Sequence, residues 1–317
     1  MPLVSVRYAT QQSVTDAAVF LAHARGYFQQ EGLDLELVNF SSSNDMVPAL
    51  ATGQLEVGAT APIASFFNAF SSGVEIKTVA ERASNLPGHG FVALVVRKDL
   101  VDSGRFRDFA DLKGLNVGMT PPLWGSGTSG PLLAAMDRGG LTTEDVNGTA
   151  LPTPELALAL RNGSLDAVMI VEPFVTNAVG NGSGVRWKGV DEFYAGHMLS
   201  GISYAPSFAA QQPEAARGFM VAYVRAAREY NTILRTGASK DELVGLLAEY
   251  STLKDRAVID RMVLHGVKPD PYIDRESVAR DLEFFLRVGV VKERVAIDRL
   301  VDDQYVKYAA DKLGKYE

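Results

Sequence analysis

The sequence predicts an α/β fold of two lobes that are joined by two hinge crossovers and followed by a helical C-terminal region. Its 317 residues exceed the size at which one hydrophobic core usually stops growing and a chain divides. Strand and helix patterns alternate through the first third of the chain and begin again near residue 115. From Pro213 onward the periodicity is helical almost throughout, so the last third differs from the first two.

The first third is predicted to alternate strands with helices, as parallel βαβ units do. Strands are expected at residues 4–8, 33–38, 55–59 and 75–80, and the second of these shows strict period-two alternation of apolar residues. Helices are expected at residues 16–30, 44–50 and 63–70, with Gly53 ending the second helix. These elements form the first part of lobe one.

A second lobe is predicted from the apolar run at residues 91–96, which ends in charged residues as a buried strand leaving a sheet would. Strand patterns then fall at 115–119, 149–151, 166–171 and 198–204, with helices at 129–138 and 154–162. Later helices are expected at 213–234, 240–250, 255–265, 275–288 and 302–312. We therefore expect residues 1–94 and 200–317 to form lobe one, and residues 95–199 to form a smaller lobe two.

Composition excludes several classes of function. The chain has 31 Lys plus Arg against 38 Asp plus Glu, with no basic stripe, so we expect no nucleic-acid partner. It has no cysteine, which removes thiolate nucleophiles, disulfides and thiolate metal sites. The four histidines are far apart and match no metal-binding spacing, so we expect no metal and no cofactor.

The start of the chain and its apolar segments bear on the cellular location of the protein. No apolar run approaches the length needed to span a bilayer. After Met1 the chain enters a strand pattern without the basic start and apolar segment of an export signal. Either the natural protein has no such signal, or the signal has been removed and Met1 stands in its place.

Polar loops follow the predicted strands of lobe one, and ligands of open parallel sheets bind at such strand ends. Helix N-termini there expose unpaired N–H groups and can hold an anionic head group without Lys or Arg. The alternative for each polar residue is that it only caps its helix. The candidate ligand contacts in these loops are Gln11, Gln12, Ser42, Ser43, Asn44, Thr60 and Ala61.

In lobe two, residues 124–130 are the candidate ligand cradle. The glycines let the backbone approach a ligand closely, the hydroxyls offer hydrogen bonds, and the indole could cover an apolar part of the ligand. The segment lacks the lysine and the spacing of a phosphate-binding loop, and a plain flexible turn is the alternative. Its candidate contacts are Trp124, Gly125, Ser126, Thr128 and Ser129.

Three further polar residues are candidates near the cleft. Glu172 follows a predicted strand and could accept a hydrogen bond from a ligand amine, or instead from a neighbouring backbone N–H. Arg82 could pair with a carboxylate or sulfonate, and Asn85 could donate a hydrogen bond. The alternative for these two is a surface turn rich in Gly and Pro.

Five segments together resemble the nitrate/sulfonate/taurine and thiamine-precursor solute-binding proteins of ABC importers. They are residues 24–36, 49–58, 112–118, 125–128 and 163–174, in matching order and spacing. The resemblance implies a type II periplasmic-binding-protein-like fold, a small-molecule ligand and an ABC permease as partner. It also implies a monomer that is periplasmic or anchored outside the cytoplasm. Sulfonate, carboxylate, nitrate-like and pyrimidine ligands all remain open.

Two other classes of function compete with a binding protein. The same fold hosts a sulfinate-cleaving hydrolase with a cysteine nucleophile and a pyrimidine synthase with cysteine-rich sequence, but this chain has no cysteine. The segment Gly125-Ser126-Gly127 is too short for a Gly-x-Ser-x-Gly nucleophile elbow, so we expect no enzyme. A cytoplasmic ligand sensor is the third class.

Overall fold

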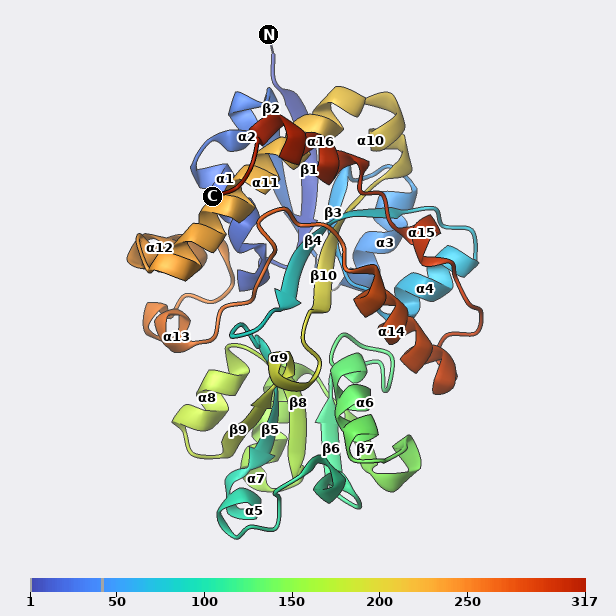
Figure 1. The fold of residues 1–317 in the computed structure, drawn as a ribbon, viewed down its shortest axis with the longest axis vertical. Helices are drawn as coiled ribbons and strands as arrows, with labels where there is room; N and C mark the ends of the chain where they lie inside the picture. Colours follow the sequence, from blue (N-terminus) through green and yellow to red (C-terminus); the bar gives the residue numbers. More distant parts are fainter. Residues whose placement is uncertain (1, 41–42) are drawn as a thin grey trace.

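The computed structural model describes residues 2–40 and 43–317, which form two α/β lobes (Figure 1). Each lobe is built around a five-stranded sheet, with the orders β2-β1-β3-β10-β4 and β7-β6-β8-β5-β9. We call the parts of the chain around these sheets the first and second lobes. Both chain ends lie in the first lobe, at the top of Figure 1. The predicted two-lobed fold class is confirmed.

Four strands of the first sheet come from the first third of the chain. They are β1 (Val4–Thr10), β2 (Leu33–Asn39), β3 (Val57–Thr60) and β4 (Lys77–Asn85). Strand β1 pairs in parallel with β2 and β3, so their carboxyl ends meet at one edge. The fifth strand, β10 (His197–Tyr204), returns from the second lobe and runs antiparallel between β3 and β4. Two separate parts of the chain therefore share one sheet.

One predicted helix of the first lobe is wrong in its extent. Residues 16–30 form two helices, α1 (Ala17–Ala24) and α2 (Tyr27–Gln30), with Gly26 between them at φ 69°. A residue in this left-handed conformation interrupts the right-handed helix, and glycine adopts it at little cost. The later helices α3 (Ser43–Ala51) and α4 (Ala64–Ser71) lie within a residue of the expected positions.

The second sheet begins earlier than expected. Strand β5 (Val92–Arg97) pairs along its length with β8 (Ala167–Val171) and β9 (Gly184–Gly189), so the boundary expected at residues 94–95 falls inside a strand of the second sheet. The chain crosses between the lobes at residues 86–91 and again at 194–196. A fully buried apolar run fits either sheet, so the pattern alone could not place the crossing. Strand β9 was not expected, because its alternating stretch is only four residues long and lies between two glycines.

The other elements of the second lobe follow the expected alternation of strands and helices. Its other strands are β6 (Asn116–Met119) and β7 (Asn147–Ala150). Its helices are α5 (Lys98–Asp102), α6 (Ser129–Arg138), α7 (Thr153–Asn162), α8 (Phe174–Gly180) and α9 (Val190–Phe193). Short 3-10 turns at Val14–Asp16, Phe109–Leu112 and Thr143–Asp145 complete the connections of the two lobes.

The C-terminal third is helical, as predicted, and covers the first sheet. Its helices are α10 (Pro206–Gln211), α11 (Pro213–Thr236), α12 (Lys240–Tyr250), α13 (Arg256–Arg261), α14 (Arg275–Arg287), α15 (Ile297–Leu300) and α16 (Gln304–Leu313). In α11 the buried Phe219 contacts Tyr8 of β1, with ring centroids 6.1 Å apart. Aromatic residues at helical spacing therefore serve core packing.

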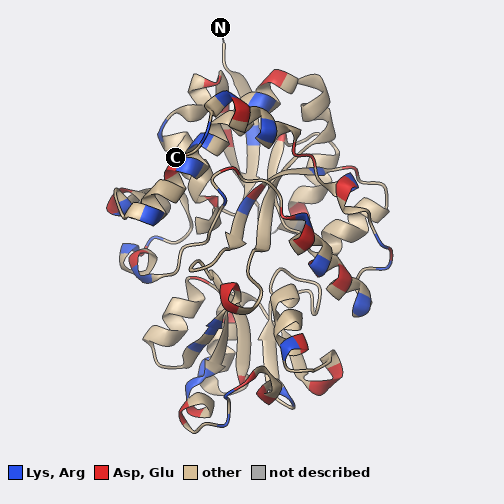
Figure 2. Cartoon of the chain, in the orientation of Figure 1, with Lys and Arg blue, Asp and Glu red and all other residues tan. Residues whose placement is uncertain are grey.

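Two of these helices reach the second lobe: α14 contacts α6, and α13 contacts α8. Acidic and basic residues are interspersed along the chain in both lobes (Figure 2). In the described part of the chain, no helix combines the length and apolar content needed to cross a membrane.

Candidate functional site

Asn85 joins the two crossovers between the lobes. Its Nδ2 lies 3.0 Å from Nδ1 of His197 at the start of β10, and its Oδ1 accepts a hydrogen bond from the amide of Val92 at 3.0 Å. The carbonyl of Asn85 also accepts from the amide of Gly196. Because the side chain is fully buried and bonded to residues beside both crossovers, its polar atoms hold the two connections between the lobes together.

Arg82, in β4, contacts the segment that follows β1. Its Nη1 donates to Oδ1 of Asp16 at 2.7 Å, and both side chains are buried. Burial alone would lower the pKa of Arg82, but the Asp16 carboxylate outweighs it and the pKa is raised. The guanidinium therefore stays charged and paired with a carboxylate of the protein.

The buried Asp16–Arg82 pair also fixes the loop that contains Gln12. Oδ2 of Asp16 accepts from the hydroxyl of Thr10 at 2.5 Å, and that hydroxyl accepts from the amide of Gln12 at 2.7 Å. Gln12 has φ 49°, a left-handed conformation that is uncommon for a residue other than glycine. Sequence reasoning missed Asp16, because nothing in its pattern distinguishes a buried partner from a helix cap.

The remaining candidates of the first lobe differ in exposure. Oγ of Ser43 lies 3.5 Å from Oε1 of Gln11, so the loops after β1 and β2 adjoin. Ala61 is half-buried, whereas the hydroxyl of Thr60 is buried against Ser203 at 2.6 Å. Ser42 lies outside the described residues, and nothing is described of the side chain of Asn44.

In the second lobe, the hydroxyls of residues 126–129 bond to one another. Oγ of Ser126 lies 2.9 Å from Oγ of Ser129 and 3.2 Å from Oγ1 of Thr128, and all three side chains are buried. Trp124 has φ 61° and its ring covers Gly148 of β7, where an added Cβ would lie 2.5 Å from Cζ2. The indole is half-buried against the second sheet.

The segment 124–128 meets the first lobe directly. The amide of Ala64, at the start of α4, donates to the carbonyl of Gly125 at 3.1 Å. An added Cβ on Gly127 would make ordinary contacts with Ile63 and Leu199 of the first lobe, both at 3.9 Å. Backbone of the predicted cradle therefore faces the loop after β3 across the boundary between the lobes.

Glu172 makes a second contact between the lobes. Its Oε1 accepts from the amide of Val263, which follows α13, at 3.2 Å, and its Oε2 accepts from the amide of Thr176 in α8 at 2.9 Å. The side chain is buried, and both carboxylate oxygens are bonded to backbone. This arrangement matches the structural alternative for Glu172.

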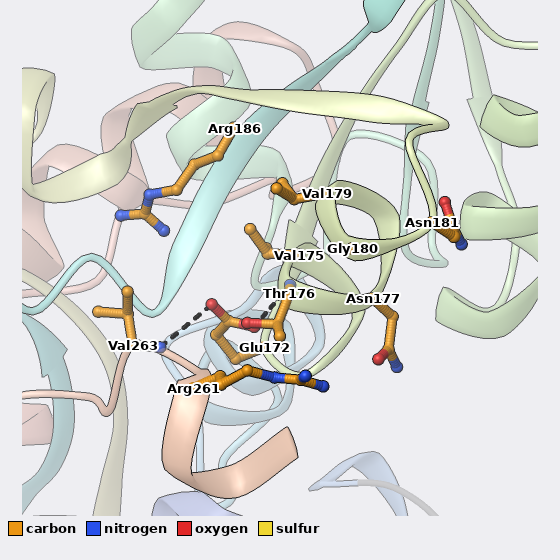
Figure 3. A pocket seen from close by; sticks show the side chains of 10 residues that line it. All are labelled: Glu172, Val175, Thr176, Asn177, Val179, Gly180, Asn181, Arg186, Arg261 and Val263. Atoms are coloured by element: carbon orange, nitrogen blue, oxygen red, sulfur yellow. Dashed lines mark hydrogen bonds between the residues drawn. The ribbon is translucent and has the colours of Figure 1, made fainter. Parts of the chain in front are cut away.

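Beside Glu172 lies a pocket of about 640 Å³ between α8 and the end of α13, which we call the lateral groove (Figure 3). Its volume is in the range of small-molecule sites. No sequence pattern pointed to its other members, because valines and arginines on helices and strands are ordinary surface and core residues. The groove is lined by Glu172, Val175, Thr176, Asn177, Val179, Gly180, Asn181, Arg186, Arg261 and Val263.

The two five-stranded sheets and the loops that face each other between them define a two-lobed protein with a periplasmic-binding-protein-like fold. More particularly, the chain belongs to the NMT1-like family, which matches residues 1–248.

A candidate aliphatic sulfonates-binding protein of Bacillus subtilis is 22% identical over 324 residues, covering 98% of this chain and 89% of the relative. The crystal structure of the periplasmic aliphatic sulphonate binding protein SsuA of Escherichia coli has a TM-score of 0.75 at 19% identity, covering 97% of this chain and 99% of SsuA. The periplasmic nitrate-binding protein NrtA of Synechocystis PCC 6803 has a TM-score of 0.75 at 15% identity, covering 98% of this chain and 89% of NrtA. The two structural similarities establish the fold.

Proposed function

We propose that this protein is the solute-binding component of an ABC importer and captures a small organic ligand by closing its two lobes. The ligand would be anionic or rich in carbonyl groups, of the sulfonate, carboxylate, nitrate-like or pyrimidine class. One observation carries the proposal: the loop after β3 and the segment 124–128 face each other from different lobes, joined by the Ala64–Gly125 hydrogen bond. The names of the relatives, two of them sulfonate binders, point the same way.

The geometry of the loops reduces the number of candidate residues that we propose to contact the ligand. We retain Gln11, Gln12, Ser43, Ala61 and Trp124, which are all half-buried and lie at strand ends or in the facing segment. Glu172 and Asn85 have protein partners for their charged or polar atoms, and Arg82 is paired with Asp16 through Nη1, while its buried Nε has no hydrogen-bond partner among the described residues. We assign structural roles to all three. The hydroxyls of Ser126, Thr128 and Ser129 shape the segment whose backbone faces the first lobe.

Closure follows from which bonds cross between the lobes. The Ala64–Gly125 and Val263–Glu172 hydrogen bonds each join atoms of different lobes, so both break when the lobes separate. A ligand that contacts both lobes binds the closed arrangement better and shifts the population toward it. A permease in the membrane would then recognise the closed form, and the protein would work outside the cytoplasm, as its relatives' names indicate for them.

A thermal-shift screen tests the proposal. The purified protein is melted with a panel of alkanesulfonates, aromatic carboxylates, nitrate and pyrimidines, because a ligand that binds only the native state raises the melting temperature. We expect at least one member to raise it in a concentration-dependent way and to be recovered chemically unchanged. A panel without any hit, or a hit that the protein converts to a product, would contradict the proposal.

A further inference from the structure

The lateral groove is built from both lobes. Arg261 and Val263 come from the first lobe, at the end of α13 and just after it, whereas the other lining residues belong to α8, β9 and the strand end at Glu172 in the second lobe. The groove is separate from the loops at residues 10–13 and 60–61 and from the segment 124–128. Anything bound in it contacts both lobes at once.

The charge of the groove favours an anion. It contains two guanidinium groups, those of Arg186 and Arg261, and one carboxylate, that of Glu172. The Glu172 oxygens accept backbone hydrogen bonds, and within residues 2–40 and 43–317 this carboxylate forms no ion pair with either arginine. In Figure 3, Arg186 lies above Glu172 and Arg261 below it.

The two arginines differ in the number of hydrogen-bond and ion-pair partners that they have within the protein. Nη1 of Arg186 donates to the carbonyl of Gly90, and its Nη2 lies 3.9 Å from the Asp191 carboxylate, so that arginine is held in place. Arg261 is exposed, and within residues 2–40 and 43–317 it has neither an ion pair nor a side-chain hydrogen bond. Its charge is therefore available to a ligand.

The groove also offers apolar surface for the body of a ligand. Val175 is buried, Val263 is half-buried, and Val179 is 46% exposed. Burying such surface contributes roughly 25 cal/mol per Å². Asn177 and Asn181 lie on the exposed side and can donate hydrogen bonds to an anionic oxygen.

We propose that the lateral groove is a second binding site, for an organic anion whose sulfonate or carboxylate group pairs with Arg261 and whose short apolar body covers the valines. Guanidinium groups bind the planar or trigonal oxygens of such anions with two parallel hydrogen bonds. Since the ligand contacts both lobes, it favours the closed arrangement. This effect on closure rests on the proposed function, whereas binding in the groove does not.

The test is a methyl NMR titration of the full chain, labelled at valine and leucine methyl groups, with hexane-1-sulfonate, hexanoate and the uncharged hexan-1-ol. We expect both anions to shift the methyl signals of Val175, Val179 and Val263, and hexan-1-ol to bind more weakly. Arg261→Gln should weaken hexane-1-sulfonate binding about twofold to fivefold, as the loss of one exposed charge contact does. Raising the salt concentration should weaken it as well.

Two further variants keep the result interpretable. Arg161→Gln removes an exposed arginine from α7, outside the groove, and should leave the affinity unchanged. Val179→Asp places a carboxylate at an exposed position of the groove and should abolish binding of the anions while the protein remains folded.

Three outcomes would overturn the groove site. They are no methyl shift at all, equal affinity for hexan-1-ol and the sulfonate, or shifts confined to Leu123, Leu199 and Val290. These last three residues lie in or beside the segment that contains Gly125 and Gly127. Shifts confined to them would support the proposed function and contradict only the second site, so the two failures are distinguishable.

Discussion

The carbonyl oxygen of Gly125 accepts a hydrogen bond from the amide of Ala64 at 3.1 Å and so joins the second lobe to the first. Glycine leaves space at this contact: an added Cβ would lie 3.0 Å from Cβ of Ala64 and 3.3 Å from Cγ of Pro122, so these neighbours would have to move by a few tenths of an ångström. We expect a methyl group at this position to move the two facing segments slightly apart.

Gly125→Ala is therefore expected to shift the protein toward open lobes. Overpacking of this kind costs about 1 kcal/mol or more, which would weaken any ligand that needs the closed form about fivefold or more. The distance between spin labels on Leu158→Cys and Tyr308→Cys, one in each lobe, measures the effect directly, because the chain has no other cysteine.

Gly127→Ala is the matched control, since its added Cβ makes only ordinary contacts at 3.9 Å. We expect its distance distribution to match that of the unsubstituted protein. If Gly125→Ala also left the distribution unchanged, the two segments would not be in contact in solution.

The buried Asp16–Arg82 pair should stabilise the fold far more than a surface pair does. Arg82→Met leaves the Asp16 carboxylate buried without its cation, and we expect a loss of roughly 3–5 kcal/mol in the free energy of unfolding, measured in urea. The double variant Asp16→Asn with Arg82→Met should lose less than the sum of the two single losses.

The exposed Lys98–Asp102 pair in α5 provides the comparison. Its nitrogen and oxygen lie 2.6 Å apart, but both side chains are more than half exposed, so Lys98→Met should cost under about 0.5 kcal/mol. Equal losses from Lys98→Met and Arg82→Met would show that burial adds nothing to the Asp16–Arg82 interaction.

The sequence predicted helices and strands better than it predicted which side chains contact each other. Alternation along residues 33–38 located β2, and helical periodicity located α6 and α12 almost to the residue, because both signals are local. The break at Gly26 needed a left-handed φ, and the sequence does not show which glycines adopt it.

The candidate site was harder to predict, because its contacts join distant parts of the chain. Arg82 was recognised as a cation, but its partner Asp16 is 66 residues away. Arg261 belongs to a helix that the pattern extended to residue 265, and nothing local places that helix beside α8. Only the assembled lobes bring these residues together.

His265 should make stability depend on pH. Burial, followed by the charges of Arg82 and His89, lowers the pKa of His265 to about 3. Between that value and the ordinary histidine pKa of about 6.5, the unfolded chain binds a proton that the folded protein does not. The free energy of unfolding must therefore fall as the pH falls, by about 1 kcal/mol from this residue between pH 7 and pH 5.5.

His265→Phe should remove this dependence, and urea unfolding at the two pH values measures it. The phenyl ring can keep the contacts with Tyr230 and Phe91, and the buried Nε2 has no hydrogen-bond partner among the described residues. Burial raises the pKa of the neighbouring Glu81 too, and its effect is common to both proteins and cancels in the comparison. An unchanged pH dependence in the variant would mean that His265 is not the residue responsible.

The variant Gln12→Gly tests whether the side chain of Gln12 binds ligand or stabilises the loop. A residue with a side chain is strained at φ 49°, and glycine is not. Gln12→Gly should therefore not lower the free energy of unfolding, and should raise it by up to about 1 kcal/mol. The backbone bonds of Gln12 to Thr10 and Thr252 do not need its side chain and should persist. Affinity for a ligand found in the thermal-shift screen should nevertheless fall, because the amide group beside Gln11 is lost.

Ser239→Gly is the control for Gln12→Gly, because Ser239 has φ 59° at the start of α12, outside the facing loops. It relieves the same kind of strain, so we expect a similar gain in stability with no change in ligand affinity. If both variants bound ligand as the unsubstituted protein does, the left-handed loop would be strain without a binding function. If Gln12→Gly alone lost stability, its side chain would be holding the loop, and the proposed ligand contact at Gln12 would be wrong.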